Sequence, residues 1–151
     1  MLSPALAAAL ASALAAALTA QAAAPASSPS IDGIWRSPGG NSIIKIALCG
    51  DNPCGTVVWA TDKAKKDSSK STDQLVGTQL LTNLQQDKKG RWEGKLFIPD
   101  RKMRVTAKID RLGPTQLRVS GCAAGKALCK AAVWTAFSAD LPVDTSVPAP
   151  Q

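Results

Sequence analysis

Apolar and polar residues alternate with a period of two along much of the chain, and no segment shows the three-to-four spacing of an amphipathic helix. In residues 102–110, Met103, Val105, Ala107 and Ile109 alternate with polar or charged residues. This pattern predicts a strand with one face in a core and the other in water. The predicted strands are residues 33–36, 42–48, 55–60, 78–84, 91–98, 102–110, 116–120 and 130–137.

The breaks between these strands carry residues that favour turns. Glycine, proline, asparagine and aspartate gather in segments such as GDNP at 50–53 and RLGP at 111–114. Most connections are short, which suits antiparallel hairpins and excludes parallel crossovers. The sequence therefore predicts an all-β fold, a small eight-stranded antiparallel up-and-down β-barrel, because closing the sheet buries its apolar face and removes its edges.

Two segments lie outside the strand pattern. Residues 61–74, TDKAKKDSSKSTDQ, are polar and lysine-rich and are expected to form a long mobile loop between two strands. The Pro-rich tail at 138–151 is expected to be disordered. The barrel domain is therefore expected over residues 31–137.

The N-terminal segment is typical of an export signal. No charged residue precedes Asp32, and an apolar stretch is followed by small residues at a suitable spacing. We expect a signal peptide over residues 1–24, cleaved after Ala22 or Ala24, and a Ser/Pro-rich linker over 25–30. The alternative is an Ala-rich membrane anchor, which the weak hydrophobicity of alanine disfavours. The mature protein is expected to be periplasmic or secreted, with no membrane span after cleavage.

The cysteines form two close pairs, Cys49 with Cys54 and Cys122 with Cys129. Each pair flanks a predicted hairpin turn, and an exported protein meets oxidising conditions, so we expect the disulfides Cys49–Cys54 and Cys122–Cys129. A zinc site is the alternative, but the C-x4-C and C-x6-C spacings do not suit it and the chain has no histidine. A redox-active C-x-x-C motif is absent from the sequence. No metal and no cofactor is expected.

The residue inventory restricts catalysis. The chain has no histidine and no tyrosine, which removes histidine-based triads and the commonest general base near neutral pH. Most aspartates fall in predicted turns or loops, and Glu93, the only glutamate, falls on a predicted outer face. We expect a non-enzymatic protein without catalytic residues. A hydrolase that uses two aspartates is the remaining enzymatic alternative.

The tryptophans Trp35, Trp59, Trp92 and Trp134 each fall in a predicted strand. The interior of an eight-stranded barrel is either filled by side chains or holds one small ligand. Trp35, Trp59 and Trp92 are expected inside, where they fill the core or line a ligand cavity. Trp134 is out of phase with the apolar alternation of its strand and is expected against the outside of the barrel or at one end.

The formal net charge of +7 favours an anionic partner. Basic residues gather on the predicted outer faces of the strands, at Arg91, Lys95, Lys102, Arg104, Lys108, Arg118 and Lys130. This basic face is expected either to attract an anionic envelope component or to serve only solubility and edge protection. Nucleic acid is disfavoured as a partner, because the aromatic residues do not interleave the basic positions.

Ordered blocks of sequence extend across the predicted barrel: DGIWRS at 32–37, IALCGDNPCGTVVWA at 46–60, LVGTQLLTNL at 75–84, RWEGKLFIPDRKMRVTAKI at 91–109, LRVSGC at 117–122 and AVWTAF at 132–137. Together they resemble the DUF2147 family of exported bacterial proteins of uncharacterised function. The resemblance implies a lipocalin-like, calycin-type barrel, with Gly33 and Trp35 matching the G-x-W of its first strand. The chain departs from the family at Ala136, where the family carries an arginine that could pack over the first-strand tryptophan.

These observations favour one function and leave a second open. The leading interpretation is binding of a small apolar or amphiphilic, lipid-like ligand in the barrel mouth near Trp35, Trp59 and Trp92, with a basic rim that favours an anionic head group. The alternative is an interaction module whose basic face binds an anionic envelope polymer or a partner protein.

Overall fold

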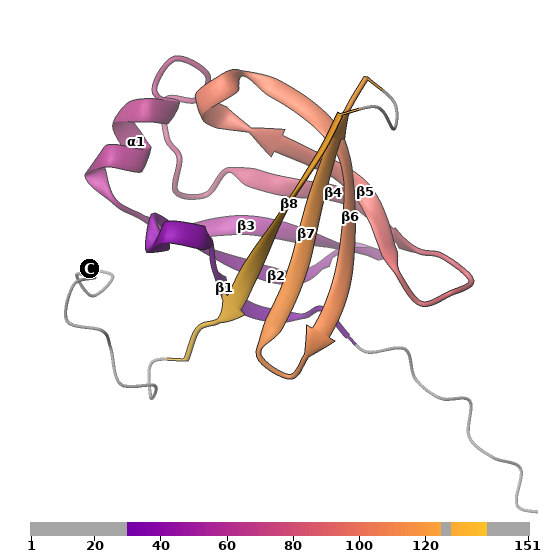
Figure 1. The fold of residues 1–151 in the computed structure, drawn as a ribbon. Helices are drawn as coiled ribbons and strands as arrows, with labels where there is room; N and C mark the ends of the chain where they lie inside the picture. The colour runs from indigo at the N-terminus through magenta and orange to yellow at the C-terminus, as the bar shows by residue number, and fades with distance from the viewer. Residues whose placement is uncertain (1–29, 125–127, 139–151) are drawn as a thin grey trace, which may run out of the picture.

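The computed structural model, described here over residues 30–124 and 128–138, is a closed antiparallel barrel in which each strand pairs with the next along the chain and β8 pairs with β1 (Figure 1). The predicted eight-stranded barrel is confirmed. Its strands are β1 Gly33–Arg36, β2 Ser42–Cys49, β3 Asn52–Ala60, β4 Gln79–Gln86, β5 Trp92–Ile98, β6 Met103–Gly113, β7 Gln116–Ala123 and β8 Leu128–Ala136. Three short helices join them: η1 Pro38–Gly40, α1 Asp62–Ser68 and η2 Pro99–Arg101.

Three segments predicted from the sequence lie wholly or almost wholly outside the described residues. The signal peptide over 1–24 and nearly all of the Ser/Pro-rich linker precede residue 30, and the Pro-rich tail follows residue 138 almost entirely. All three remain predictions.

The barrel interior is filled from all sides by apolar side chains. The alternation predicted for residues 102–110 is confirmed, because Val105, Ala107 and Ile109 of β6 are buried and the polar residues between them are not. The inner faces of the other strands supply the rest of this core, which includes Trp35, Ile44, Ile46, Val57, Leu81, Leu84, Leu117 and Val119. Area-proportional burial of such side chains provides the main driving force for the fold.

Of the two places expected for Trp134, the outside of the barrel is wrong, whereas a place near one end agrees with its position two residues before the end of β8. Trp134 is 6% exposed, belongs to the core cluster and lies opposite Leu117 of β7. Ala132 and Ala136, two residues away on either side, share its face, because side chains alternate along a strand. Small inner residues leave room for the indole, whereas Val133 on the outer face is 41% exposed. The larger apolar residues of β8 therefore suggested the wrong face.

The expectation of a long loop over residues 61–74 is also wrong for the first half of that segment, which forms α1. Thr61 caps the helix by accepting a hydrogen bond from the Ala64 backbone N–H at 3.2 Å. Asp62 lies in the first turn and Lys65 in the last, and each charge interacts favourably with the helix dipole at its end of the helix. In Figure 1 the helix lies at one end of the barrel, close to η2.

The two predicted disulfides are confirmed. Cys49–Cys54 clips the β2–β3 hairpin, and Cys122–Cys129 joins residues that lie opposite each other on β7 and β8. No cysteine is free. The two bridges lie at opposite ends of the barrel, since antiparallel strands place successive connections at alternate ends.

We expect reduction of both disulfides to lower the free energy of unfolding by about 2 kcal/mol for each bridge, because short cross-linked loops restrict the unfolded chain only modestly. Urea unfolding followed by circular dichroism, with and without a thiol reductant, measures the loss. The double variants Cys49→Ser/Cys54→Ser and Cys122→Ser/Cys129→Ser separate the two contributions. A loss of the whole fold on reduction would contradict the view that the core, rather than the bridges, maintains the barrel.

Candidate functional site

The two ends of the barrel are formed by different connections between the strands. At one end the β2–β3, β4–β5 and β6–β7 hairpins meet the segment that precedes β1, and at the other end lie η1, α1, η2 and the approach of β7 to β8. We call these the closed end and the open end.

Trp35 and Arg111 cover the closed end. The Trp35 Nε1 donates a hydrogen bond to the Ile31 carbonyl at 3.0 Å, and the Arg111 guanidinium lies over the indole at 5.5 Å from the ring centroid. Arg111 also donates to the carbonyls of Ser30, Gly113 and Pro114. Position 136 is an alanine, and the cation over the first-strand tryptophan comes from Arg111 of β6. The polar groups of this cluster are therefore matched, and the closed end is packed.

A cavity of about 400 Å³ lies at the open end, beside the ends of the last four strands; we call it the mouth cavity. Its lining residues are Ile98, Arg101, Met103, Val105, Gly121, Ala123, Leu128, Cys129 and Lys130. Most of these continue the inner face of the barrel: Ile98 lies opposite Met103, and Ala123 lies opposite Leu128. Cavities that hold small ligands have volumes of about 300–1,000 Å³ and mainly apolar walls, so this one has the size and character of a ligand site.

Two cationic side chains, Arg101 and Lys130, lie among these apolar residues, and none of the described lining residues is acidic. Lys130 was expected on the outer basic face, but it lies opposite Gly121 on the inner face of the barrel. It stays exposed because the inner face reaches solvent at the end of β8. The Arg101 Nε is 4.0 Å from the Asp100 carboxylate, a solvent-exposed pair that leaves most of the guanidinium available.

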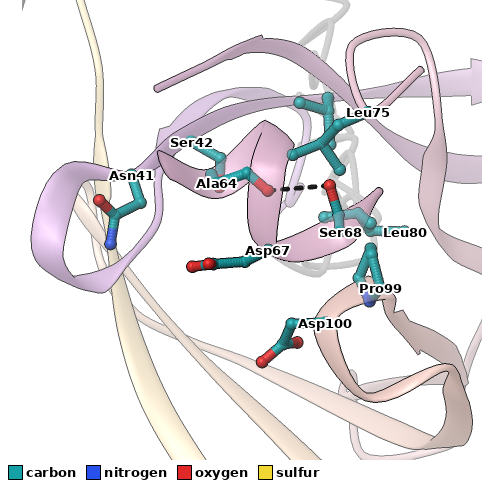
Figure 2. A pocket seen from close by; sticks show the side chains of 10 residues that line it. Asn41, Ser42, Ala64, Asp67, Ser68, Leu75, Leu80, Pro99 and Asp100 are labelled. Carbon is teal, nitrogen blue, oxygen red and sulfur yellow. Dashed lines mark hydrogen bonds between the residues drawn. The ribbon is translucent and has the colours of Figure 1, made fainter. Parts of the chain in front are cut away.

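A second cavity, of about 220 Å³, lies at the open end between α1 and η2; we call it the helix cavity (Figure 2). Its lining residues are Asn41, Ser42, Val57, Ala64, Asp67, Ser68, Leu75, Leu80, Pro99 and Asp100. Figure 2 shows Leu75 on one side and the carboxylates of Asp67 and Asp100 on the other. Ser68 is buried here and donates to the Ala64 carbonyl at 2.8 Å, so its hydroxyl is satisfied.

The three tryptophans predicted to line a ligand cavity are not brought together, and none of them lines the mouth cavity or the helix cavity. Trp35 is 2% exposed at the closed end. Trp92 faces inward opposite Ile109, and its indole N–H is buried without a hydrogen-bond partner. Trp59 is half-buried and lies opposite Ile43, whose neighbour Ile44 faces the core, so Trp59 is on the outer face. A ligand role for these tryptophans remains a prediction.

The residues of the predicted basic face are only partly gathered. Lys95, Arg104 and Lys108 share the outer face of β5 and β6, and the Arg104 guanidinium lies 4.7 Å from the centroid of the Phe97 ring. Lys102 adopts a left-handed conformation after η2, at the open end.

Acidic residues interrupt the same basic face. Glu93 lies opposite Lys108, and Asp110 lies opposite Arg118. Arg91 forms an ion pair with Asp87 at 3.0 Å, where the Arg91 backbone N–H lowers the pKa of the Asp87 carboxyl by donating a hydrogen bond to it. The outer surface is therefore mixed in charge, and a role for it in binding stays a prediction.

Within residues 30–124 and 128–138, no three His, Cys, Asp or Glu side chains gather in a way that could hold a metal ion. In the same ranges no helix has both the length and the apolar character needed to cross a membrane.

Sequence reasoning missed both cavities, although part of the signal was present. Ile98 and Met103 flank the PDR turn on the inner faces of two adjacent strands, and Gly121 places no side chain between them and β8. A Cβ atom built on Gly121 would lie 3.0 Å from a Val105 methyl group, so the glycine keeps the floor of the mouth cavity open. Only the barrel register shows that these positions share one end.

Comparison with known proteins agrees with the fold. A family model described as "Uncharacterized protein conserved in bacteria (DUF2147)" matches residues 33–136. Among solved structures, the chain is similar to that of protein HP1028 from Helicobacter pylori, described as belonging to the lipocalin family, with a TM-score of 0.56 and 15% sequence identity over 73% of this chain and 84% of that chain. The comparison with curated proteins gives no match. The resemblance and the lipocalin-like fold predicted from the sequence are confirmed.

Proposed function

This chain belongs to the DUF2147 family, and from that premise we propose that it binds a small amphiphilic molecule at the open end of its barrel rather than catalysing a reaction. The apolar part of the ligand lies in the mouth cavity, and its anionic group lies at Arg101 and Lys130. The lipocalin-like fold supports a binding role only in general terms, because one fold hosts many functions.

The observation that carries the proposal is the composition of the mouth cavity. Each methylene group moved from water into such an apolar space contributes about 0.8 kcal/mol. A carboxylate or phosphate at the rim would gain charge-assisted hydrogen bonds from Arg101 and Lys130, and none of the described lining residues would repel it. An apolar floor with a cationic rim matches an alkyl chain that ends in an anion.

A hydrolase that uses two aspartates is less well supported. Asp67 and Asp100 line the same cavity, but their side chains are 46% and 54% exposed, and Asp67 is held by Lys63 at 2.5 Å. A carboxyl group that acts as a general acid is usually buried away from water, which neither side chain is.

An envelope location is part of the proposal. Two disulfides are typical of proteins that mature in oxidising compartments, and the export signal predicted at residues 1–24 would deliver the chain there. Detection of the cleaved protein in a periplasmic or culture fraction, with a mature N-terminus at or near residue 23 or 25, tests this part; a protein confined to the cytoplasm would contradict it.

We expect the double variant Arg101→Glu/Lys130→Glu to bind dodecanoate at least about tenfold more weakly than the parent protein, because two attractive charges become repulsive and a tenfold change needs only about 1.4 kcal/mol. Isothermal titration calorimetry with dodecanoate measures the affinity. Dodecanol, which lacks the anion, should show a much smaller difference between the two proteins.

The matched control is Arg104→Glu/Lys108→Glu, which makes the same change in charge on the outer face of β6. We expect this variant to bind dodecanoate like the parent protein. Equal loss in both double variants would show that net charge rather than the mouth cavity governs binding. Failure of the parent protein to bind any single-chain amphiphile would overturn the proposed function.

A further inference from the structure

We propose that the ligand is zwitterionic: a single-chain amphiphile whose anionic group binds at the mouth cavity and whose primary ammonium group binds in the helix cavity beside Asp100. Phosphoethanolamine and amino-acid head groups have this chemistry. The inference rests on the proposed function and names the class of ligand for the same end of the barrel.

The three-residue turn η2 and the residue before it serve both cavities. Ile98 and Arg101 line the mouth cavity, whereas Pro99 and Asp100 between them line the helix cavity. The Asp100 Oδ2 and the Arg101 Nε are only 4.0 Å apart. A cation-binding group and an anion-binding group are therefore adjacent, each in its own cavity, which is the arrangement that a short zwitterionic head group requires.

The polar side of the helix cavity suits an ammonium group. Asp67 from α1 and Asp100 from η2 extend there, opposite Leu75 (Figure 2). Asn41 and Ser42 contribute an amide and a hydroxyl to the same lining. None of the described lining residues carries a positive charge, so the wall of the cavity offers hydrogen-bond acceptors to a bound ammonium.

Lys63 of the protein itself interacts with these carboxylates. The Lys63 Nζ donates to Asp67 at 2.5 Å, and this hydrogen bond, with smaller contributions from the charges of Asp67 and Asp100, raises the pKa of Lys63. Asp67 is thus engaged by Lys63. Asp100 is 4.0 Å from Arg101, beyond ordinary hydrogen-bond length, so its carboxylate keeps acceptor capacity for a ligand.

A hydrogen bond connects the two walls of the helix cavity. The Ser71 hydroxyl, which follows α1, donates to the Pro99 carbonyl in η2 and to the Ser68 carbonyl at the end of α1. The bond to Pro99 joins residues 28 positions apart in the chain. Asp67 and Asp100 are therefore presented from connected elements, and less ordering is needed when a ligand binds.

The test compares three single-chain probes with the same twelve-carbon chain below their micelle-forming concentrations: dodecanoate, the lysophosphatidic acid and the lysophosphatidylethanolamine. We expect the parent protein to bind the ethanolamine probe about tenfold more tightly than the phosphatidic acid probe, the size of effect expected for one charge-assisted hydrogen bond. Asp100→Asn should abolish this preference without weakening binding of the phosphatidic acid probe. Lys63→Gln should increase the preference, because it removes the competing cation.

The matched control is Asp51→Asn, which makes the same charge change at an exposed turn residue at the closed end. We expect Asp51→Asn to keep the preference for the ethanolamine probe. If the parent protein binds dodecanoate but does not distinguish the two phosphate probes, or if Asp100→Asn retains the preference, the zwitterion inference is overturned while the proposed function stands. If none of the three probes binds, both fail.

Discussion

Replacing Trp35 by alanine is expected to lower the free energy of unfolding by about 3–5 kcal/mol, the range for removing a large aromatic side chain from a core. Trp35 is 2% exposed and belongs to the main core cluster. The substitution also removes the donor to the Ile31 carbonyl and the ring beneath the Arg111 guanidinium. Urea unfolding monitored by far-ultraviolet circular dichroism measures the loss.

Trp59→Ala is the matched control for Trp35→Ala. It removes the same side chain from the half-buried outer face of β3, so we expect a clearly smaller loss of stability. Trp35→Phe should give an intermediate loss, since it keeps an aromatic ring but no N–H donor. Equal effects of Trp35→Ala and Trp59→Ala would contradict the placement of Trp35 in the core and of Trp59 on the outer face.

Gly94→Ala is expected to destabilise the barrel by about 1–3 kcal/mol or more, because the added methyl group has no space. A Cβ atom at Gly94 would lie 2.6 Å from the Thr82 carbonyl oxygen and 2.9 Å from that of Asn83. Both are backbone atoms of β4 at an irregularity in its pairing with β5, where Asn83 has a positive φ of 54°. Relief of the clash would require strand movement rather than a change of rotamer.

Gly113→Ala provides the comparison for Gly94→Ala. A Cβ atom at Gly113, the last residue of β6, would meet nothing within 4 Å. We expect this variant to be neutral or slightly stabilising, since alanine reduces the freedom of the unfolded chain. The same unfolding assay measures both variants. A small effect at Gly94 would mean that β4 and β5 can separate locally without cost.

The architecture could be predicted from the sequence because a half-buried strand shows apolar residues at every second position, as in β6. Features without such a periodic pattern were missed. The only buried residue of α1 is Ser68, so the helix has no apolar stripe; its start depends on Thr61 as a cap and its place on contact with η2. In β8 the largest inner residue, Trp134, has alanines beside it, which reversed the expected face.

The candidate site was less predictable than the fold. The alternation of a strand gives the face on which a residue lies, but not how close that residue is to the end of the barrel. Lys130 shares the inner face with Trp134, yet one reaches solvent and the other is 6% exposed. Asp100 lines one cavity and Arg101 lines the other because of how η2 is placed. Contacts with α1, which is distant in the sequence, help to set that placement, so the local sequence pattern does not predict it.

The closure between β1 and β8 has a consequence for how the chain folds. Trp35 lies opposite Ala136 and Arg36 opposite Thr135, so this pairing joins the two ends of the barrel sequence, whereas the other pairings join consecutive strands. Pairing across the longest sequence separation costs the most chain entropy before any contact is gained, so we expect the barrel to close after its hairpins have formed. Until then β1 and β8 are unpaired edges open to aggregation or strand exchange, and the four-residue length of β1 limits that risk.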